Sequence, residues 1–198
     1  MGLPVIGDTL VFLRKHLSSY LSAELGISPD EAGADKVVFV DGDKVDPITF
    51  PSGAVSALLI NVEEERVLRA ADRYVRRADD GSPQHVQPDI RLVLYVLFVA
   101  RFKEYEVAWE HLSKIIEHFQ GVPVFEQETT PELPTGIEKL GMELVTLRFA
   151  EQNEVWSALR ATYHPSILYR VKLVAMRDRK PQPLSQVTEV NVELRRIS

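Results

Sequence analysis

The sequence PDIRLVLYVLFVA, residues 88–100, contains the longest apolar run of the chain. From Ile90 onward, apolar side chains occupy both sets of alternate positions, which is typical of a β-strand that is covered on both faces. Pro88 lacks an amide proton and disfavours helix in the residue before it, so extended structure is favoured here. The run is far shorter than the roughly 20 residues that a membrane helix needs. The segment therefore predicts a strand inside a buried sheet.

The segments around this strand alternate between helical and extended periods. Apolar residues at three- and four-residue steps predict amphipathic helices over residues 4–25, 103–120 and 151–162. In the second helix the predicted buried face consists of Ala108, Leu112, Ile115 and Phe119, widened by Trp109 and Ile116. Further strands are predicted at residues 36–40, 54–62, 122–125, 143–149 and 167–176, and the strand at 54–62 is expected near the middle of the sheet because both of its faces are apolar.

Three segments have the composition of loops or linkers. Residues 74–87 are charged and centred on an Asp-Asp-Gly-Ser-Pro turn, and residues 126–135 contain two prolines, so both predict exposed loops. In the linker region 178–198, Val190, Val192 and Leu194 alternate with polar residues after a proline-rich turn. This pattern predicts either an edge strand or an arm that adds to the sheet of a neighbouring subunit.

Composition sets limits on the class of protein. The chain has 198 residues and is 45% hydrophobic, so it is expected to fold as a single domain, residues 1–198. Its formal net charge is −6, and its compact basic cluster, Arg73, Arg76 and Arg77, is followed at once by two aspartates, so nucleic-acid binding is not expected. No signal peptide or membrane span is recognisable, which predicts synthesis in the cytoplasm.

The sequence lacks the motifs of common enzyme sites. It has no cysteine, no glycine-rich phosphate loop and no Gly-x-Ser-x-Gly nucleophile motif. His111 and His118 lie two helical turns apart, about 10 Å, which is too far to bind one metal ion directly. The acidic runs 63–65 and 79–80 fall in predicted exposed turns and are expected to form a solvated charged surface. We therefore expect no enzymatic activity, no cofactor and no metal.

A family resemblance comes from the second half of the chain. The segment Glu154–Leu159, followed by Tyr163–Tyr169 with its Pro-Ser pair, resembles the signature of the tail-terminator or cap family of contractile phage-tail-like injection systems, of the antifeeding-prophage or virulence-cassette type. The proline-led strand Pro88–Tyr95 and the helix around 108–119 are also similar to that family. The likeness extends over residues 3–177.

This resemblance implies an α+β subunit with a mixed, largely antiparallel sheet flanked by helices. It also implies a structural protein that forms a hexameric ring, caps the inner tube and anchors the sheath, with copies of itself, the tube protein and the sheath protein as partners. The motif residues Trp156, Pro165 and Tyr169 are expected to maintain the fold. The alternative is an adaptor subunit in another multi-protein particle. Exposure, charge and strand pattern suggest these contact residues: Arg73, Arg76, Arg77, Glu126, Glu128, Glu132, Val190, Val192 and Leu194.

Overall fold

The computed structural model describes residues 5–25, 36–40, 47–65, 75–77, 83–85, 90–175 and 182–183. The chain divides into two compact units. The first contains residues 1–67 and 89–176, and the second contains residues 68–88 and 177–198. The assignment of the whole chain to one domain stays a prediction.

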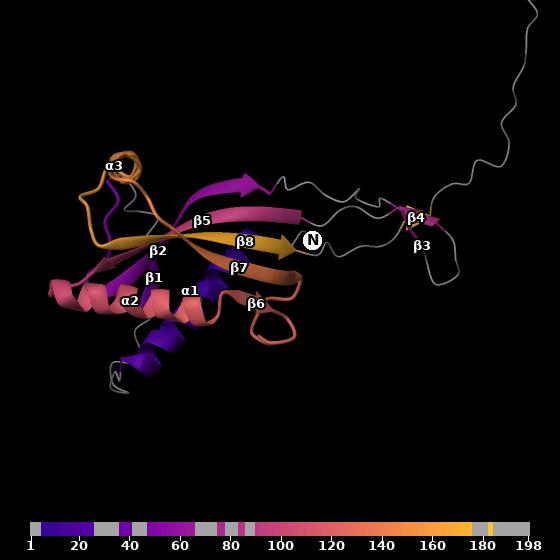
Figure 1. Cartoon of the computed structure of the whole chain (residues 1–198), viewed down its shortest axis with the longest axis horizontal. Coiled ribbons are helices and arrows are strands. Elements are labelled where there is room, and N and C mark those ends of the chain that lie inside the picture. The colour runs from indigo at the N-terminus through magenta and orange to yellow at the C-terminus, as the bar shows by residue number, and fades with distance from the viewer. Residues whose placement is uncertain are drawn as a thin grey trace, which may run out of the picture. The chain divides into compact units, whose positions relative to one another are not determined.

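The first unit is a six-stranded sheet with helices on both faces (Figure 1). Its elements follow in chain order: α1 (Val5–Glu24), β1 (Val37–Phe39), β2 (Ala54–Glu64), β5 (Ile90–Arg101), α2 (Tyr105–Gly121), β6 (Val124–Glu126), β7 (Ile137–Val145), α3 (Phe149–Ala158) and β8 (Ser166–Ala175). The strand order is β1-β2-β5-β8-β7-β6. Only β1 and β2 pair in parallel, and the other pairs are antiparallel. The expected mixed, largely antiparallel α+β fold is therefore confirmed.

Strand β5 lies in the interior of this sheet, as its sequence predicts. It pairs with β2 on one side and with β8 on the other along nearly its whole length. Side chains on both of its faces are buried, including Val96 and Phe98 on one face and Leu97 and Val99 on the other. The apolar residues at both sets of alternate positions are explained by this double coverage.

Helices α1 and α2 cover one face of the sheet, where they build the larger core. Leu13, Leu17 and Leu21 of α1 are fully buried there. The predicted face of α2 is confirmed for Ala108, Leu112, Ile115 and Phe119. Trp109 was expected on the same face, which is wrong, because its side chain is 54% exposed. It packs one helical turn away on Tyr105, with the ring centroids 5.1 Å apart.

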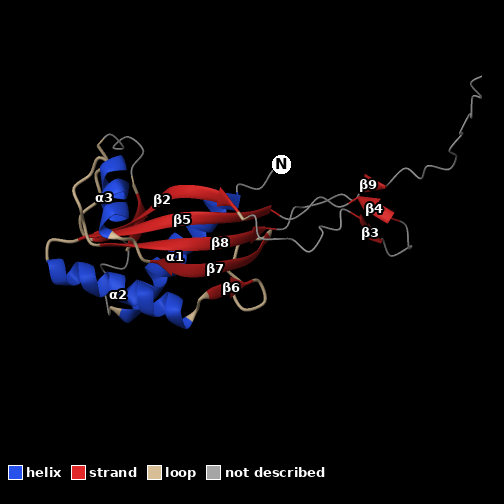
Figure 2. Ribbon diagram, turned by 45° about the horizontal axis from the view of Figure 1, so that its top comes forward, coloured by secondary structure: helices blue, strands red, loops and turns tan. Residues whose placement is uncertain are grey.

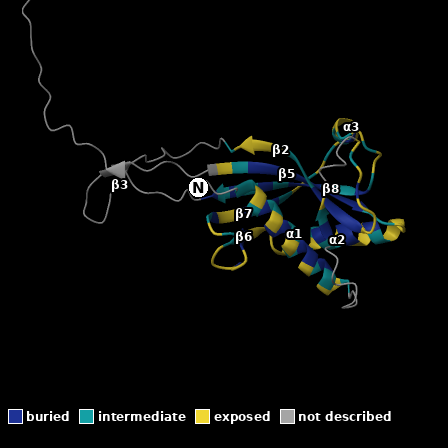
Figure 3. Cartoon of the chain, turned by 180° about the vertical axis from the view of Figure 1, so that it is seen from behind, coloured by how far each residue is buried: buried dark blue, intermediate teal, exposed yellow. Residues whose placement is uncertain are grey.

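Among the described residues, α3 and the segment before β2 cover one end of the other face of the sheet. There Trp156 of α3 and Phe50 pack on Leu97, Val99 and Leu168. Strand β2 is second from the sheet's edge, and only its first four residues, 54–57, are buried. The expectation that residues 54–62 are covered on both faces is therefore wrong for the second half, which is exposed toward its end (Figure 3). Residues 63 and 64 belong to this exposed strand end and not to a turn.

The boundary between β7 and α3 differs from the prediction. The strand expected at 143–149 lies at Ile137–Val145, and Phe149 begins α3 with its side chain 92% exposed. The backbone amide of Arg148 donates a hydrogen bond of 2.7 Å to the Glu151 carboxylate, which starts the helix at this point. A register shift between Ile137 and Lys139 interrupts the alternation at the start of β7. These two local features conceal the true boundaries.

The second unit contains a small three-stranded antiparallel sheet (Figure 2). Its strands are β3 (Val75–Arg77), β4 (Pro83–His85) and β9 (Gln182–Pro183), in the order β3-β4-β9. The prediction of a loop throughout residues 74–87 is therefore wrong for β3 and β4. Strands of three residues are too short to show an alternating pattern in sequence, which is why turn residues dominate the segment.

Candidate functional site

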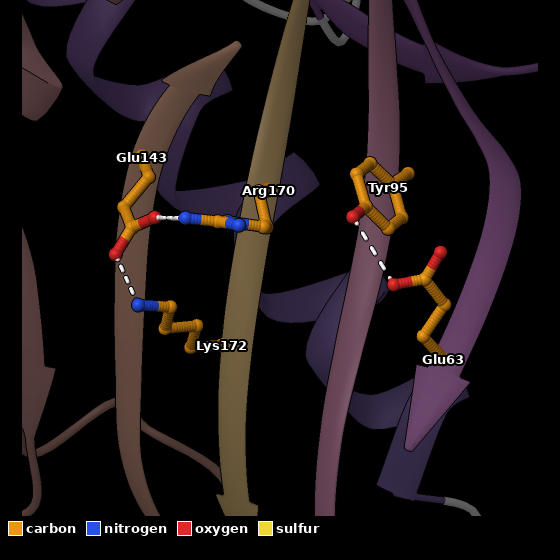
Figure 4. A network of polar contacts seen from close by, with 5 residues as sticks. All are labelled: Glu63, Tyr95, Glu143, Arg170 and Lys172. Carbon is orange, nitrogen blue, oxygen red and sulfur yellow. Dashed lines mark hydrogen bonds and ion pairs between the residues drawn. The ribbon is translucent and has the colours of Figure 1, made fainter. Parts of the chain in front are cut away.

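The sheet face on which α3 packs also carries a row of polar side chains. Tyr95 of β5 lies opposite Arg170 of β8, which lies opposite Glu143 of β7. Lys172 follows two residues along β8, and Glu63 comes from the exposed end of β2. Figure 4 shows these side chains on the same face of the sheet. The pleat places them there because residues two apart on a strand share a face.

Two sets of contacts connect these residues. The carboxylate of Glu143 accepts a hydrogen bond of 2.9 Å from Arg170 Nε and forms an ion pair of 2.5 Å with Lys172 Nζ. The Tyr95 hydroxyl donates to the Glu63 carboxylate at 3.2 Å. The hydrogen bonds from Lys172 and Arg170 lower the pKa of the Glu143 carboxyl. Because these side chains remain half-exposed, the pairs contribute little to stability and are available to a partner.

The end of β6 and the loop between β6 and β7 carry the three candidate acids of the first unit. The Gln127 side-chain amide donates to the carbonyl oxygens of Leu133 and Pro134, both at 2.9 Å, and so fixes the loop's shape. Glu126 forms an ion pair of 2.7 Å with Lys139 on β7. Glu128 and Glu132 are exposed. The loop is thus a defined acidic projection, although buried Thr130 and Leu133 anchor its middle to the core.

The remaining candidate contact residues lie elsewhere. Arg76 and Arg77 are in strand β3 of the second unit, whereas the acidic loop belongs to the first unit. Four candidates lie outside the described residues: Arg73, Val190, Val192 and Leu194. The choice of Arg73, Arg76, Arg77, Glu126, Glu128, Glu132, Val190, Val192 and Leu194 as contact residues stays a prediction.

Sequence reasoning missed two groups of exposed side chains. The first is the polar row described above, whose signal was present in the alternation of Arg170 and Lys172 with apolar residues. The second is the aromatic pair Tyr105 and Trp109, which lies off the apolar stripe of α2 with both rings exposed. Tyrosine and tryptophan are enriched among residues that dominate binding energy at interfaces, so the pair is a candidate contact. A helical projection that separates the stripe from Trp109 would have found it.

Few features of the described residues favour ligand chemistry. No three or more His, Asp or Glu side chains are grouped in a way that could hold a metal ion within the described ranges. Nor does any helix among those residues have the length and apolar character to cross a membrane. His111 and His118 face different neighbours: His111 Nδ1 donates to the Val107 carbonyl at 2.8 Å, while His118 Nε2 lies 2.9 Å from His16 Nε2.

One pocket of about 320 Å³ opens between α1 and the acidic loop. Its lining combines apolar and polar side chains: Val11, Phe12, Lys15, His16, Ser19, Glu132 and Pro134. It therefore places the candidate acid Glu132 close to His16 of α1. Burial lowers the pKa of His16, and the negative charge of Glu132 raises it by a smaller amount.

The first unit is thus an α+β fold with several exposed surfaces. Among solved structures, the chain is similar to the sheath/tube terminator of an extracellular contractile injection system, PVC, in the extended state. The TM-score is 0.59 at 15% sequence identity, and the match covers 100% of this chain and 66% of that one. The sequence matches the Pvc16 N-terminal domain family over residues 10–189, and the chain belongs to this family. The resemblance found in the sequence and the terminator-like fold are thereby confirmed.

A further likeness is weaker. The tube-terminating cap of the anti-feeding prophage gives a TM-score of 0.45 at 13% identity, over 71% of this chain and 49% of that chain. The chain spans about two thirds, 66%, of the length of the PVC terminator. No protein of curated function matches the sequence significantly.

Proposed function

We propose that this chain is a structural subunit that caps the end of the inner tube of a contractile injection system and stops its growth. The observation that carries the proposal is the family match over residues 10–189, on a chain that shares the fold of a sheath/tube terminator. The protein acts through its surfaces and not through catalysis. The whole chain, 1–198, serves as one terminator-like domain, made in the cytoplasm and built into the particle.

A cap on a cylindrical tube needs two kinds of contact. Copies of the chain in a hexameric ring meet through a heterologous interface, which requires two different patches on each subunit. Contacts with the tube protein, and with a sheath protein that the ring anchors, require further patches. The open polar sheet face, the acidic loop and the Tyr105–Trp109 pair offer chemically different surfaces for these contacts.

Charge is proposed to set the orientation of the cap on the tube. Complementary charges at an interface rim affect encounter and register more than raw affinity. Glu128 and Glu132, held on a loop that Gln127 fixes, are suited to this role because neither must reorganise the loop to meet a basic partner. Arg76 and Arg77 of the second unit are proposed as contacts of the opposite sign.

The capping role is tested by measuring tube lengths. Particles are produced from a gene cluster with and without this chain, and negative-stain electron microscopy gives the length distribution of their tubes. We expect a narrow distribution with the chain and a broad one, extending to longer tubes, without it. Tubes of normal length in its absence would overturn the proposed function.

The contact assignment is tested separately in the same assay. The double variant Glu128→Lys with Glu132→Lys is expected to broaden the length distribution while leaving the melting temperature unchanged. Glu154→Lys is the matched control, since Glu154 is an exposed acid on α3, outside the loop. Equal tube lengths for the loop variant and the control would remove the loop from the interface without affecting the capping role.

A further inference from the structure

The two helices on the larger core are joined by a pair of histidines. His16 of α1 and His118 of α2 approach with their Nε2 atoms 2.9 Å apart, and the two helices lie on the same face of the sheet (Figure 3). A hydrogen bond between two imidazole nitrogens needs one N–H donor and one lone pair. At least one of the two rings must therefore be neutral for this contact to exist.

Aromatic rings pack against the pair, whose own rings are half-buried. Phe12 stacks on His16 at 5.3 Å between centroids, and the Phe125 ring of β6 stands edge-on to His16 at 5.0 Å. Tyr20 lies 4.2 Å from the ring of His118. This apolar enclosure favours the uncharged imidazole, so burial lowers the pKa of both histidines.

Charged groups around the pair only partly offset this effect. Glu132, from the β6–β7 loop, raises the pKa of His16, while Lys15 of α1 lines the same pocket. A positive charge on His16 lowers the pKa of His118. On the side of Tyr20, further charges come from both helices: Glu24 of α1 and Lys114 and Glu117 of α2.

We propose that the His16–His118 pair is an acid-sensitive joint that holds α1 against α2 and opens when both rings carry a proton. A single added proton keeps the contact, because an imidazolium donates to the neutral ring. Once both rings are protonated, both Nε2 atoms are donors and two positive charges face each other among aromatic rings. The hydrogen bond is then lost and the rings must separate.

The opening is local, because other contacts hold α1 to the sheet. Leu17 and Leu21 remain in the core, and the Ser18 hydroxyl is bonded to the backbone of Val37, accepting from its amide at 3.0 Å. The region that opens is the contact lined by Phe12 of α1 and Phe125 of β6, beside the pocket. Acid therefore exposes aromatic surface between α1 and the acidic loop without unfolding the unit.

The direction of the pH effect follows from linkage. The folded pKa of each histidine lies below the ordinary value of 6.5, so the unfolded chain binds protons that the folded chain does not. The contribution of the pair to stability is complete above about pH 6.5 and is lost as the pH falls through the lowered pKa values. The joint is closed at neutral pH and weakened in acid.

Histidine NMR titration of the full chain tests the coupling directly. In the wild type we expect both ring signals to titrate below pH 6.5. His16→Gln should move the midpoint of His118 upward, because the neighbouring charge is gone, and Glu132→Gln should move that of His16 downward. An unchanged His118 midpoint in His16→Gln would overturn the proposal.

Melting curves between pH 7 and pH 5 supply a second readout. The wild type should lose on the order of 5 °C more than the double variant His16→Gln with His118→Gln over this interval. His164→Gln is the matched control, since His164 is another partly buried histidine, and burial lowers its pKa as well. It lies beside Trp156 and not at the contact between α1 and α2. It should retain most of the wild-type pH slope. Equal slopes for the wild type and the double variant would contradict an acid-sensitive joint, whatever their absolute melting temperatures.

Discussion

Replacing Trp156 by alanine should remove the main attachment of α3 to the sheet. Trp156 is the only buried residue of that helix, with 6% of its surface exposed. Its ring stands edge-on to Phe50 at 5.9 Å and to Tyr163 at 5.4 Å. Trp156 is therefore the largest contribution of α3 to the smaller core, beside partly buried Val155, and truncating it leaves a cavity that the helix can no longer fill.

The expected cost follows from this burial. A buried tryptophan removes roughly 150–250 Å² from water, and a truncation of Phe or Trp to Ala in a core typically costs about 3–5 kcal/mol. For a chain of 198 residues, each kcal/mol corresponds to about 2–4 °C in melting temperature. The Trp156→Ala variant should therefore melt roughly 6–20 °C below the wild type.

Trp109→Ala is the matched control, because the chain has only two tryptophans and Trp109 is exposed on α2. It should change the free energy of unfolding by no more than about 0.5 kcal/mol, as is usual for surface substitutions. Differential scanning calorimetry gives both melting temperatures. Each variant also retains one tryptophan, so fluorescence assigns the blue-shifted emission to Trp156. If Trp156→Ala melted within about 2 °C of Trp109→Ala, the assignment of α3 to the core through Trp156 would be refuted.

Two smaller effects are expected elsewhere. Glu143→Gln should lower the free energy of unfolding by less than about 1 kcal/mol, because its partners are half-exposed, and urea titrations should show the difference shrinking in high salt. Since the pKa of Glu143 is lowered in the folded state, this contribution is present above the ordinary value of 4.5 and is lost as the pH falls through the lowered pKa; a difference that did not shrink on acidification below pH 4.5 would contradict it. Ser18→Ala should cost about 1–3 kcal/mol in the same titrations, because the buried amide of Val37 loses its acceptor, and Ser19→Ala, on the pocket side, is its control.

The strands and helices that the sequence predicted well are those with long, regular periods. In strand β5, the buried positions on both faces of the sheet are occupied by apolar residues. In helix α2, the buried residues recur at steps of three or four positions. Such patterns arise because each element must bury one or both of its faces, so they are visible without knowledge of the fold.

The errors have local physical causes. The alternation of apolar residues at 145, 147 and 149 continues past the end of β7. The strand itself does not continue, because the Arg148–Glu151 contact starts a helix there. The second half of β2 has apolar residues, yet burial falls along the strand, and its last four residues, 61–64, are exposed. Trp109 has the character of a core residue, yet its position on α2 turns it outward onto Tyr105.

By itself, the sequence determined the class of the fold, its central strand, the burial of Trp156 and the family resemblance, because these depend on residue patterns within short segments. Only the tertiary structure decided which side chains from distant segments meet. The row from Glu63 to Lys172 depends on the register of four strands, and the contact of His16 with His118 joins residues 102 positions apart. No local pattern encodes such proximity, since it results from how the helices pack on one face of the sheet.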